Sequence, residues 1–234
     1  MSRIPGVVPA IVKSVSDPDN LGRVQVNFDW LDDAPDSHWA RVASPMAGGE
    51  RGCFFMPEIG DEVLVAFERG HVDFPYVVGY CWSSPDKPPF GANLEKRGIK
   101  TVAGSELIFD DNPGASPTIT LTTRGGFKVL LDESGAKITI ATGGGTTIEL
   151  DDRPPQVQVH LPTGNALTLG PAGLDINVAA GQLTVEALSV TVTAPTVTID
   201  AAMTTVSGVL TVAGPVIANG IVSPTYTPGA GNIW

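Results

Sequence analysis

The C-terminal end of the chain is almost uncharged and is dominated by residues that favour extended backbone. Residues 181–214 contain no Lys, no Arg and no aromatic side chain, and threonine alternates with valine along much of the stretch. β-Branched side chains favour strands, and the stretch is too apolar for a solvated tail. It also lacks the polar variety of a catalytic domain. The stretch therefore predicts a long β structure whose apolar side chains must be covered.

Similar short segments begin much earlier in the chain. From residue 106 onward, segments with two or three apolar residues, mostly at i, i+2 spacing, recur at intervals of about 7 to 10 residues, a spacing typical of a sandwich or a solenoid. Gly, Pro, Asp, Asn or Ser separates most of them. After Phe127 the only aromatic residues are Tyr226 and Trp234. A sandwich core normally uses aromatic side chains to fill its thickness, so the pattern favours a narrow solenoid.

One chain of such short strands cannot cover its own apolar face. Both the strand edges and that face would remain exposed, whereas three chains around an axis would bury them. We therefore expect an intertwined trimeric β-helix, or β-prism, in which the chains alternate along each face and threonine faces solvent. The side chains expected on the trimer axis are Val185, Val190, Val192, Val197 and Ile199.

The N-terminal part has a different composition, with three of the four tryptophans and most of the charged residues. Five strand candidates separated by turn residues lie within residues 9–82. In the clearest of them, Val24, Val26 and Phe28 alternate on one face. Five short strands without a helical period predict a small closed barrel, most commonly an OB-fold. The expected fold class is all-β, an N-terminal five-stranded OB-type barrel followed by the trimeric shaft.

This change in composition divides the chain. We expect an OB-fold barrel domain at residues 1–90, a linker at 91–105, a trimeric β-helix shaft at 106–222 and a C-terminal tip or tail segment at 223–234. The boundary lies in a stretch with three prolines, two glycines and mixed charge, which is typical of a linker.

Charge and motifs argue against several function classes. The formal net charge of −11 disfavours a nucleic-acid partner, because such proteins neutralise phosphates with basic residues. Cys53 and Cys81 lack metal-like spacing and are expected to be thiols, with a single disulfide as the alternative. There is no signal-peptide pattern and no transmembrane run, so we expect a protein made in the cytosol and not exported through a cleavable N-terminal signal.

No pattern indicates catalysis, a metal or a cofactor. The glycine-rich residues 143–147 lack the Lys-Ser/Thr ending of a phosphate loop. Two pairs of aspartates, at 110–111 and 151–152, follow strand candidates and are expected to be solvated strand ends. His160 alternates with Val159 and Leu161 and should face outward, and a metal site would need several convergent ligands. We therefore expect a protein that is not an enzyme.

Four motifs resemble a known family. They are "DPDNLGRVQV", "WARVASPMAG", "PEIGDEVLVAFERG" and "PYVVGY", and they occur in the family's order within residues 7–89. Together they resemble the OB domain of the central spike of contractile injection systems, the baseplate assembly protein V and VgrG families of phage baseplates, type VI secretion and extracellular injection particles. The segment that begins at "GIKTVAGSELIFDD" resembles the start of the family's β-helix.

The resemblance implies a non-enzymatic structural spike at the tip of a contractile tail. Three chains would form a rigid needle that docks on a separate hub protein through the OB end, contacts inner-tube proteins through that hub, and punctures the target envelope. The protein would be made and assembled in the bacterial cytoplasm, and its final location would be a phage virion or a contractile injection particle. The resemblance also implies a PAAR-type tip protein at the C-terminal end, although the last residues could equally form an unstructured tail. The expected tip contacts are Val216, Ile217, Ile221, Tyr226 and Trp234.

Two other function classes remain as alternatives. The first is a trimeric OB-fold stalk that binds a carbohydrate or a surface receptor, since OB barrels can bind oligosaccharides. Trp30, Trp39 and Trp82 are its candidate stacking residues. The second is an envelope-degrading enzyme. About 25 residues separate Cys81 from the first shaft strand, far fewer than an enzymatic domain needs.

Overall fold

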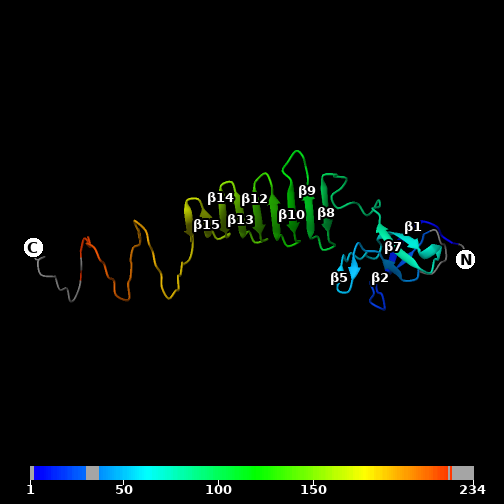
Figure 1. Cartoon of the computed structure of the whole chain (residues 1–234), viewed down its shortest axis with the longest axis horizontal. Coiled ribbons are helices and arrows are strands. Elements are labelled where there is room, and N and C mark those ends of the chain that lie inside the picture. The colour runs from blue at the N-terminus through cyan, green and yellow to red at the C-terminus, as the bar shows by residue number, and fades with distance from the viewer. Residues whose placement is uncertain (1–2, 30–36, 221, 223–234) are drawn as a thin grey trace, which may run out of the picture. The chain divides into compact units, whose positions relative to one another are not determined.

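The computed structural model describes residues 3–29, 37–220 and 222, and its regular structure is almost entirely β (Figure 1). The chain divides into two units, Met1–Leu183 and Thr184–Trp234. The first unit holds a barrel and a separate sheet, joined by residues that follow the last barrel strand. No helix within the described part of the chain is long and apolar enough to span a membrane.

The first strands close into a five-stranded barrel, as the sequence predicts. The barrel strands are β1 (Val7–Ser14), β2 (Arg23–Asn27), β3 (Ala40–Val42), β6 (Glu62–Phe67) and β7 (Pro75–Tyr80). Their order is β1-β2-β3-β7-β6, and all pairs are antiparallel except β3 with β7. A two-stranded ribbon of β4 (Ala47–Gly48) and β5 (Arg51–Gly52) lies between β3 and β6 in the chain, and the short 3₁₀ turn η1 (Glu68–Gly70) connects β6 to β7.

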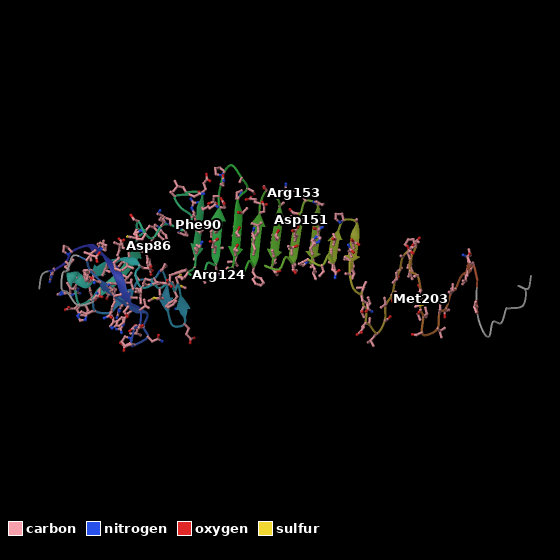
Figure 2. All side chains as sticks on the ribbon, turned by 180° about the vertical axis from the view of Figure 1, so that it is seen from behind. Asp86, Phe90, Arg124, Asp151, Arg153 and Met203 are labelled. Carbon is pink, nitrogen blue, oxygen red and sulfur yellow. The ribbon has the colours of Figure 1, made fainter. Side chains whose placement is uncertain are left out.

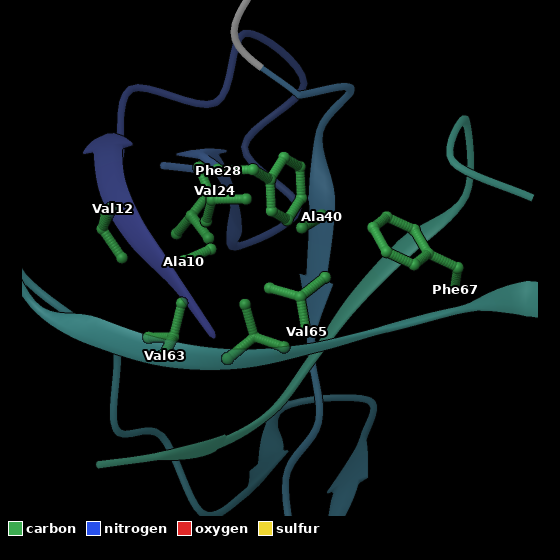
Figure 3. Packing of buried hydrophobic residues seen from close by; sticks show 10 residues of the cluster. Ala10, Val12, Val24, Phe28, Ala40, Val63, Val65 and Phe67 are labelled. Carbon is green, nitrogen blue, oxygen red and sulfur yellow. The ribbon is translucent and has the colours of Figure 1, made fainter. Parts of the chain in front are cut away.

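Alternating side chains fill the barrel (Figure 3). Val24, Val26 and Phe28 are buried together, which confirms the face expected from their spacing. The Phe28 and Phe67 rings lie 5.6 Å apart between centroids and are tilted by 49°, a favourable aromatic geometry. Each fully buried valine contributes about 1.5–3 kcal/mol relative to an exposed one. The barrel therefore has its own core and does not depend on a partner chain to bury these residues.

A charged turn joins β1 to β2. The Asp17 carboxylate accepts hydrogen bonds from the main-chain N–H groups of Leu21 (2.9 Å) and Arg23 (3.2 Å). The Arg23 guanidinium donates to both carboxylate oxygens, at 3.1 and 2.6 Å. Asn20 and Gly22 have positive φ, which closes the turn. This explains why the sequence has Asp, Asn, Gly and Arg at these positions.

The second part of the first unit is a nine-stranded antiparallel sheet in chain order (Figure 1). Its strands are β8 (Lys96–Lys100), β9 (Glu106–Asp110), β10 (Thr118–Thr122), β11 (Lys128–Asp132), β12 (Lys137–Ala141), β13 (Thr147–Asp152), β14 (Pro155–His160), β15 (Ala166–Gly170) and β16 (Gly173–Asn177). From β8 to β16, each strand is hydrogen-bonded to the next strand of the same chain. The expected alternation of three chains along each face is therefore wrong for this segment.

The sheet also begins earlier than the sequence predicts. β8 lies inside residues 91–105, which we expected to be a linker, and Ile99 pairs with Leu107 of β9. The strand is hard to recognise because Gly98 interrupts its apolar pattern. A Cβ atom at Gly98 would lie 2.3 Å from the main-chain oxygen of Leu107 and 3.0 Å from the Phe90 ring. The glycine is thus required by close packing and does not mark a loop.

Four turns of one design reverse the chain on one side of the sheet. They are Thr101–Gly104, Thr123–Gly126, Thr142–Gly145 and Leu161–Gly164. In each, the glycine N–H donates to the carbonyl of the first residue, and the glycine φ lies between +83° and +89°. This is the combination of a turn and a left-handed glycine that produces tight antiparallel hairpins.

The strands end at Asn177. We expected the shaft to continue through residue 222, but the structure assigns no strand to the described residues after β16. From residue 184 to residue 220 every residue is exposed. The local sequence favours strands here, yet a strand needs a neighbour to form main-chain hydrogen bonds, and the single chain supplies none to this segment.

Candidate functional site, the apolar face of the sheet

In-register pairing of β8 to β16 aligns apolar side chains on one face of the sheet, which we call the apolar face. One row consists of Phe109, Ile119, Leu131, Ile138, Leu150, Val157, Leu169 and Leu174. The other consists of Ile99, Leu107, Leu121, Val129, Ile140, Ile148, Val159, Leu167 and Ile176. Residues directly opposite across neighbouring strands lie about 4.5–5.5 Å apart between Cβ atoms, so each row is continuous.

The apolar face is open to solvent in the single chain. Many of its side chains are 37–60% exposed, from Leu167 at the low end to Leu174 at the high end. Within the described residues the buried apolar side chains all belong to the barrel, so no second layer covers this sheet. A contiguous apolar surface that crosses nine strands far exceeds what soluble monomers expose. The face must therefore pack against another surface.

The opposite face of the same sheet is mostly polar, although Ile108 and Leu130 lie on it beside Thr120. Lys137 on β12 lies between two acids of β13, with its Nζ 2.9 Å from Glu149 and 3.2 Å from Asp151. Hydrogen bonds to these carboxylates raise the pKa of Lys137. Lys100 pairs with Glu106 at 2.7 Å in the same cross-strand manner. Figure 2 shows side chains along both faces of the sheet, with Asp151 and Arg153 near one set of connections. This face suits contact with water, which leaves the apolar face as the candidate interface.

The expected axis residues lie outside this sheet. Val185, Val190, Val192, Val197 and Ile199 are 60–70% exposed and belong to no strand. Their role on a trimer axis stays a prediction. The sequence alone does not assign axis positions to the apolar residues between 99 and 176. Their i, i+2 spacing was the available signal, but spacing alone does not say which strands are neighbours.

The expected tip contacts are only partly described. Val216 and Ile217 are exposed. Ile221, Tyr226 and Trp234 lie outside the described residues. Their part in binding a tip protein stays a prediction.

Among the described residues, the histidines, cysteines and acids do not form a metal-binding cluster. Within the described ranges there is no group of three or more His, Cys, Asp or Glu residues that could hold a metal. Cys53 and Cys81 are free thiols. His160 is exposed, and its Nε2 lies 3.5 Å from the Gln158 side chain.

The candidate stacking residues of the carbohydrate alternative have different surroundings. The Trp39 ring faces the guanidinium of Arg23, 6.0 Å from the ring centroid. Trp82 is exposed, and Trp30 lies outside the described residues. This arrangement gives the carbohydrate alternative no support of its own.

Two protein families match the two parts of the first unit. Residues 8–82 match the injector OB domain of type VI secretion systems and phage baseplates. Residues 96–159 match the C-terminal trimerisation domain of phage baseplate protein V. Together the two matches cover more than half of the chain. The first coincides with the barrel and the second with most of the sheet that carries the apolar face.

Curated spike proteins are similar over the same region. The type VI secretion system spike protein VgrG3 of Vibrio cholerae is 30% identical over 133 residues, which are 51% of this chain and 13% of that protein. VgrG2a of Pseudomonas aeruginosa, another such spike protein, is 29% identical over 46% of this chain and 14% of its own length. The actin cross-linking toxin VgrG1 of V. cholerae is 32% identical over 41% of this chain and 10% of its own length. The matched region is thus a small part of each relative.

Proposed function

The chain belongs to the family of VgrG-like spikes of phage baseplates and type VI secretion systems, and from this premise we propose that it is the non-enzymatic central spike of a contractile injection system. The observation that carries the proposal is the open apolar face, which falls in the segment that matches a trimerisation domain. The barrel and the sheet occur in the chain order of the two matched family domains.

The proposed assembly is a homotrimer. Three copies related by a threefold axis would turn their apolar faces inward and their polar faces, with the Lys137 ion pairs, toward solvent. Each face would then be covered by the two other chains, and no unpaired charge would enter the core. Within the second unit, Val185, Val192 and Ile199 would line the core of the trimer.

A trimer of this kind would be suited to a mechanical role. Its sheets would be paired along their whole length by main-chain hydrogen bonds and packed on a dry core, so the shaft would resist compression without any chemical step. We propose that it crosses the target envelope when the sheath contracts.

The proposed partners lie at the two ends of the chain. The barrel would dock on a hub protein and through it on the inner tube, and its exposed Leu21, Phe54, Phe55 and Ile59 support a protein partner for this domain. A PAAR-type tip protein would bind the residues around Val216 and Ile217. The spike would be made in the bacterial cytoplasm and assembled into a phage or an injection particle.

The first experiment measures the mass of the purified full-length chain by size exclusion with light scattering at micromolar concentration. A threefold assembly of the 24.3 kDa chain predicts about 73 kDa. A stable monomer at this concentration would contradict the proposal.

The second experiment locates the protein. In particles from the native host, a tag on the barrel should be seen by gold labelling at the baseplate, on the axis of the tail. Label elsewhere would rule out a central spike.

A further inference from the structure

The two ends of the strands in the sheet differ in charge. We call the four glycine turns, residues 101–104, 123–126, 142–145 and 161–164, the turn rim. The connections at the other ends of the strands, residues 111–117, 133–136, 153–154 and 171–172, are the opposite rim. Arg124 is the only charged residue of the turn rim, whereas the opposite rim contains Asp111, Glu133 and Arg153. Figure 2 shows Arg124 and Arg153 at opposite ends of the strands.

Several charges near the strand ends are already paired within the chain. Asp111 binds Arg97, with the two charged groups 2.7 Å apart, and Asp110 binds Lys96 at 3.3 Å. Glu133 and Arg124, by contrast, are exposed, and the side chain of neither makes an ion pair or a hydrogen bond to another described residue. These two side chains are therefore available to a second copy.

Strand β11 separates the two available charges. Arg124 lies in the turn that precedes β11, and Glu133 directly follows the last residue of the strand. Lys128, the first residue of β11, adds positive charge at the Arg124 end. Asp132, the last residue, accepts a hydrogen bond of 3.0 Å from the Gly135 N–H and thus belongs to its own turn. The strand has positive charge at one end and negative charge at the other.

The proposed homotrimer determines which rims meet. Nine strands at a spacing of about 4.8 Å span about 38 Å, whereas one five-residue strand spans about 17 Å. The apolar face is thus longest across its strands, and a threefold axis that covers it runs in that direction. Contacts around a threefold axis are heterologous. The turn rim of one copy then meets the opposite rim of the next, with equivalent strands at the same level.

We propose that Arg124 of one copy forms an ion pair with Glu133 of the next copy, so that three such pairs close a ring around the shaft at the level of β11. The two residues lie on either side of β11, about one strand spacing apart along the axis, and their long side chains bridge that distance. A guanidinium suits this contact because it can donate two parallel hydrogen bonds to one carboxylate. The inference rests on the proposed homotrimer.

The ion pairs would supply specificity that the apolar rows lack. The rows repeat Val, Ile and Leu from strand to strand, so copies displaced by a strand would still pack apolar side chains together. A displaced heterologous contact does not close into a ring. Because Arg124 is the only charged residue of the turn rim, it identifies one level of the sheet and favours the closed arrangement.

The first test places cysteines at the two positions in a chain with Cys53→Ser and Cys81→Ser, which has no other thiol. Arg124→Cys together with Glu133→Cys should be joined between copies by a short bismaleimide, giving covalent trimers on a denaturing gel. Each cysteine alone should give no cross-link, because unlike rims meet. Arg124→Cys with Ala172→Cys is the matched control, since Ala172 lies on the opposite rim four strands further along the sheet, about 19 Å away from Glu133.

The second test exchanges the charges in the otherwise unchanged chain. Arg124→Glu and Glu133→Arg, each alone, should lower the melting temperature of the trimer by about 2–4 °C, because like charges meet three times. The two changes together should restore the wild-type value. Arg124→Glu with Asp152→Arg should not, although Asp152 is also exposed and lies at the same strand ends. At about 1 M salt the differences should vanish.

The outcomes separate this inference from the homotrimer. A wild-type chain that is a stable monomer refutes the homotrimer itself. A trimer whose Arg124→Cys and Glu133→Cys positions do not cross-link overturns the inference alone. So does a double charge exchange that stays as unstable as the single variants, or a cross-link through Ala172→Cys.

Discussion

Asp17 shows how one carboxylate organises the barrel at the scale of a residue. Its side chain is only 4% exposed and accepts hydrogen bonds from the Arg23 side chain and from three main-chain N–H groups. These bonds, the one to the Arg23 side chain first, hold the pKa of Asp17 well below its usual range. Arg23 in turn faces the Trp39 ring. A connection rich in turn residues thus becomes a fixed junction between β1 and β2.

The lowered pKa of Asp17 predicts acid sensitivity of the barrel. A carboxylate with a depressed folded pKa stabilises the fold above its unfolded pKa of about 3.9, and this contribution is lost as the pH falls below that value toward the folded pKa. Asp17→Asn should lower the melting temperature of the barrel at pH 7 and should weaken its dependence on pH below about 4. Tryptophan fluorescence melts of the full-length chain would measure this.

Asp19→Asn is the matched control for Asp17→Asn. Asp19 also pairs with Arg23, but its side chain is largely exposed. It should change the melting temperature less. Identical pH profiles for wild type and Asp17→Asn would show that the buried carboxylate does not govern acid stability.

At the scale of the element, neighbouring turns on one side of the sheet pack against one another. The turns after β10 and after β12 lie side by side. Two strands separate them in the chain, but both turns are on the same side of the antiparallel sheet. Gly143 lies so close to Gly125 that a Cβ atom would be 2.2 Å from the Gly125 main-chain oxygen. The neighbouring Gly144 has open space, with Thr142 Oγ1 at 3.9 Å as its nearest contact. The glycine-rich tract therefore serves packing between turns.

This contact predicts different effects for two adjacent substitutions. Gly143→Ala should destabilise the sheet by about 1–3 kcal/mol, because the backbone atoms that it meets cannot move aside without shifting a turn. Gly144→Ala should change stability by less than about 0.5 kcal/mol. Thermal unfolding of the trimer, followed by far-ultraviolet circular dichroism, measures both. Equal melting temperatures for the two variants would show that the turns do not touch in the assembled shaft.

At the scale of the whole molecule, the parts of the chain differ in how much of their own structure they bury. The barrel has its own buried core, the sheet pairs its strands within the chain but leaves its apolar face open, and residues 184–220 have neither strand pairing nor burial in a single chain. Positive charge is also confined to the first part of the chain, since no Lys or Arg occurs after Arg153. Dependence on other copies thus increases from the barrel to the C-terminal end.

The last residues of the chain are predicted to contact a tip protein. Tyr226 and Trp234 return after a long stretch without aromatic residues, and we propose that they help to bind a PAAR-type tip protein. A chain without residues 223–234 should remain a trimer of unchanged melting temperature but should retain less of that protein in a pull-down. Unchanged retention would assign these residues another role.

The sequence by itself predicted most of the strands up to Asn177 and which of their side chains share a face. The alternation of Val24, Val26 and Phe28 predicted the barrel core, and the apolar spacing of β9 to β16 predicted strands at the observed places, because alternation is a local property of extended backbone. The tertiary structure decided which strands are neighbours. It placed β8 inside the expected linker, where Gly98 hides the pattern, and it paired β8 to β16 within one chain. Main-chain hydrogen bonds can join any two strand edges, whatever their side chains. Alternation therefore shows which side chains share a face but not which strand is the neighbour. Turn geometry decides that partner, and at four of the turns a left-handed glycine returns the chain to its own edge.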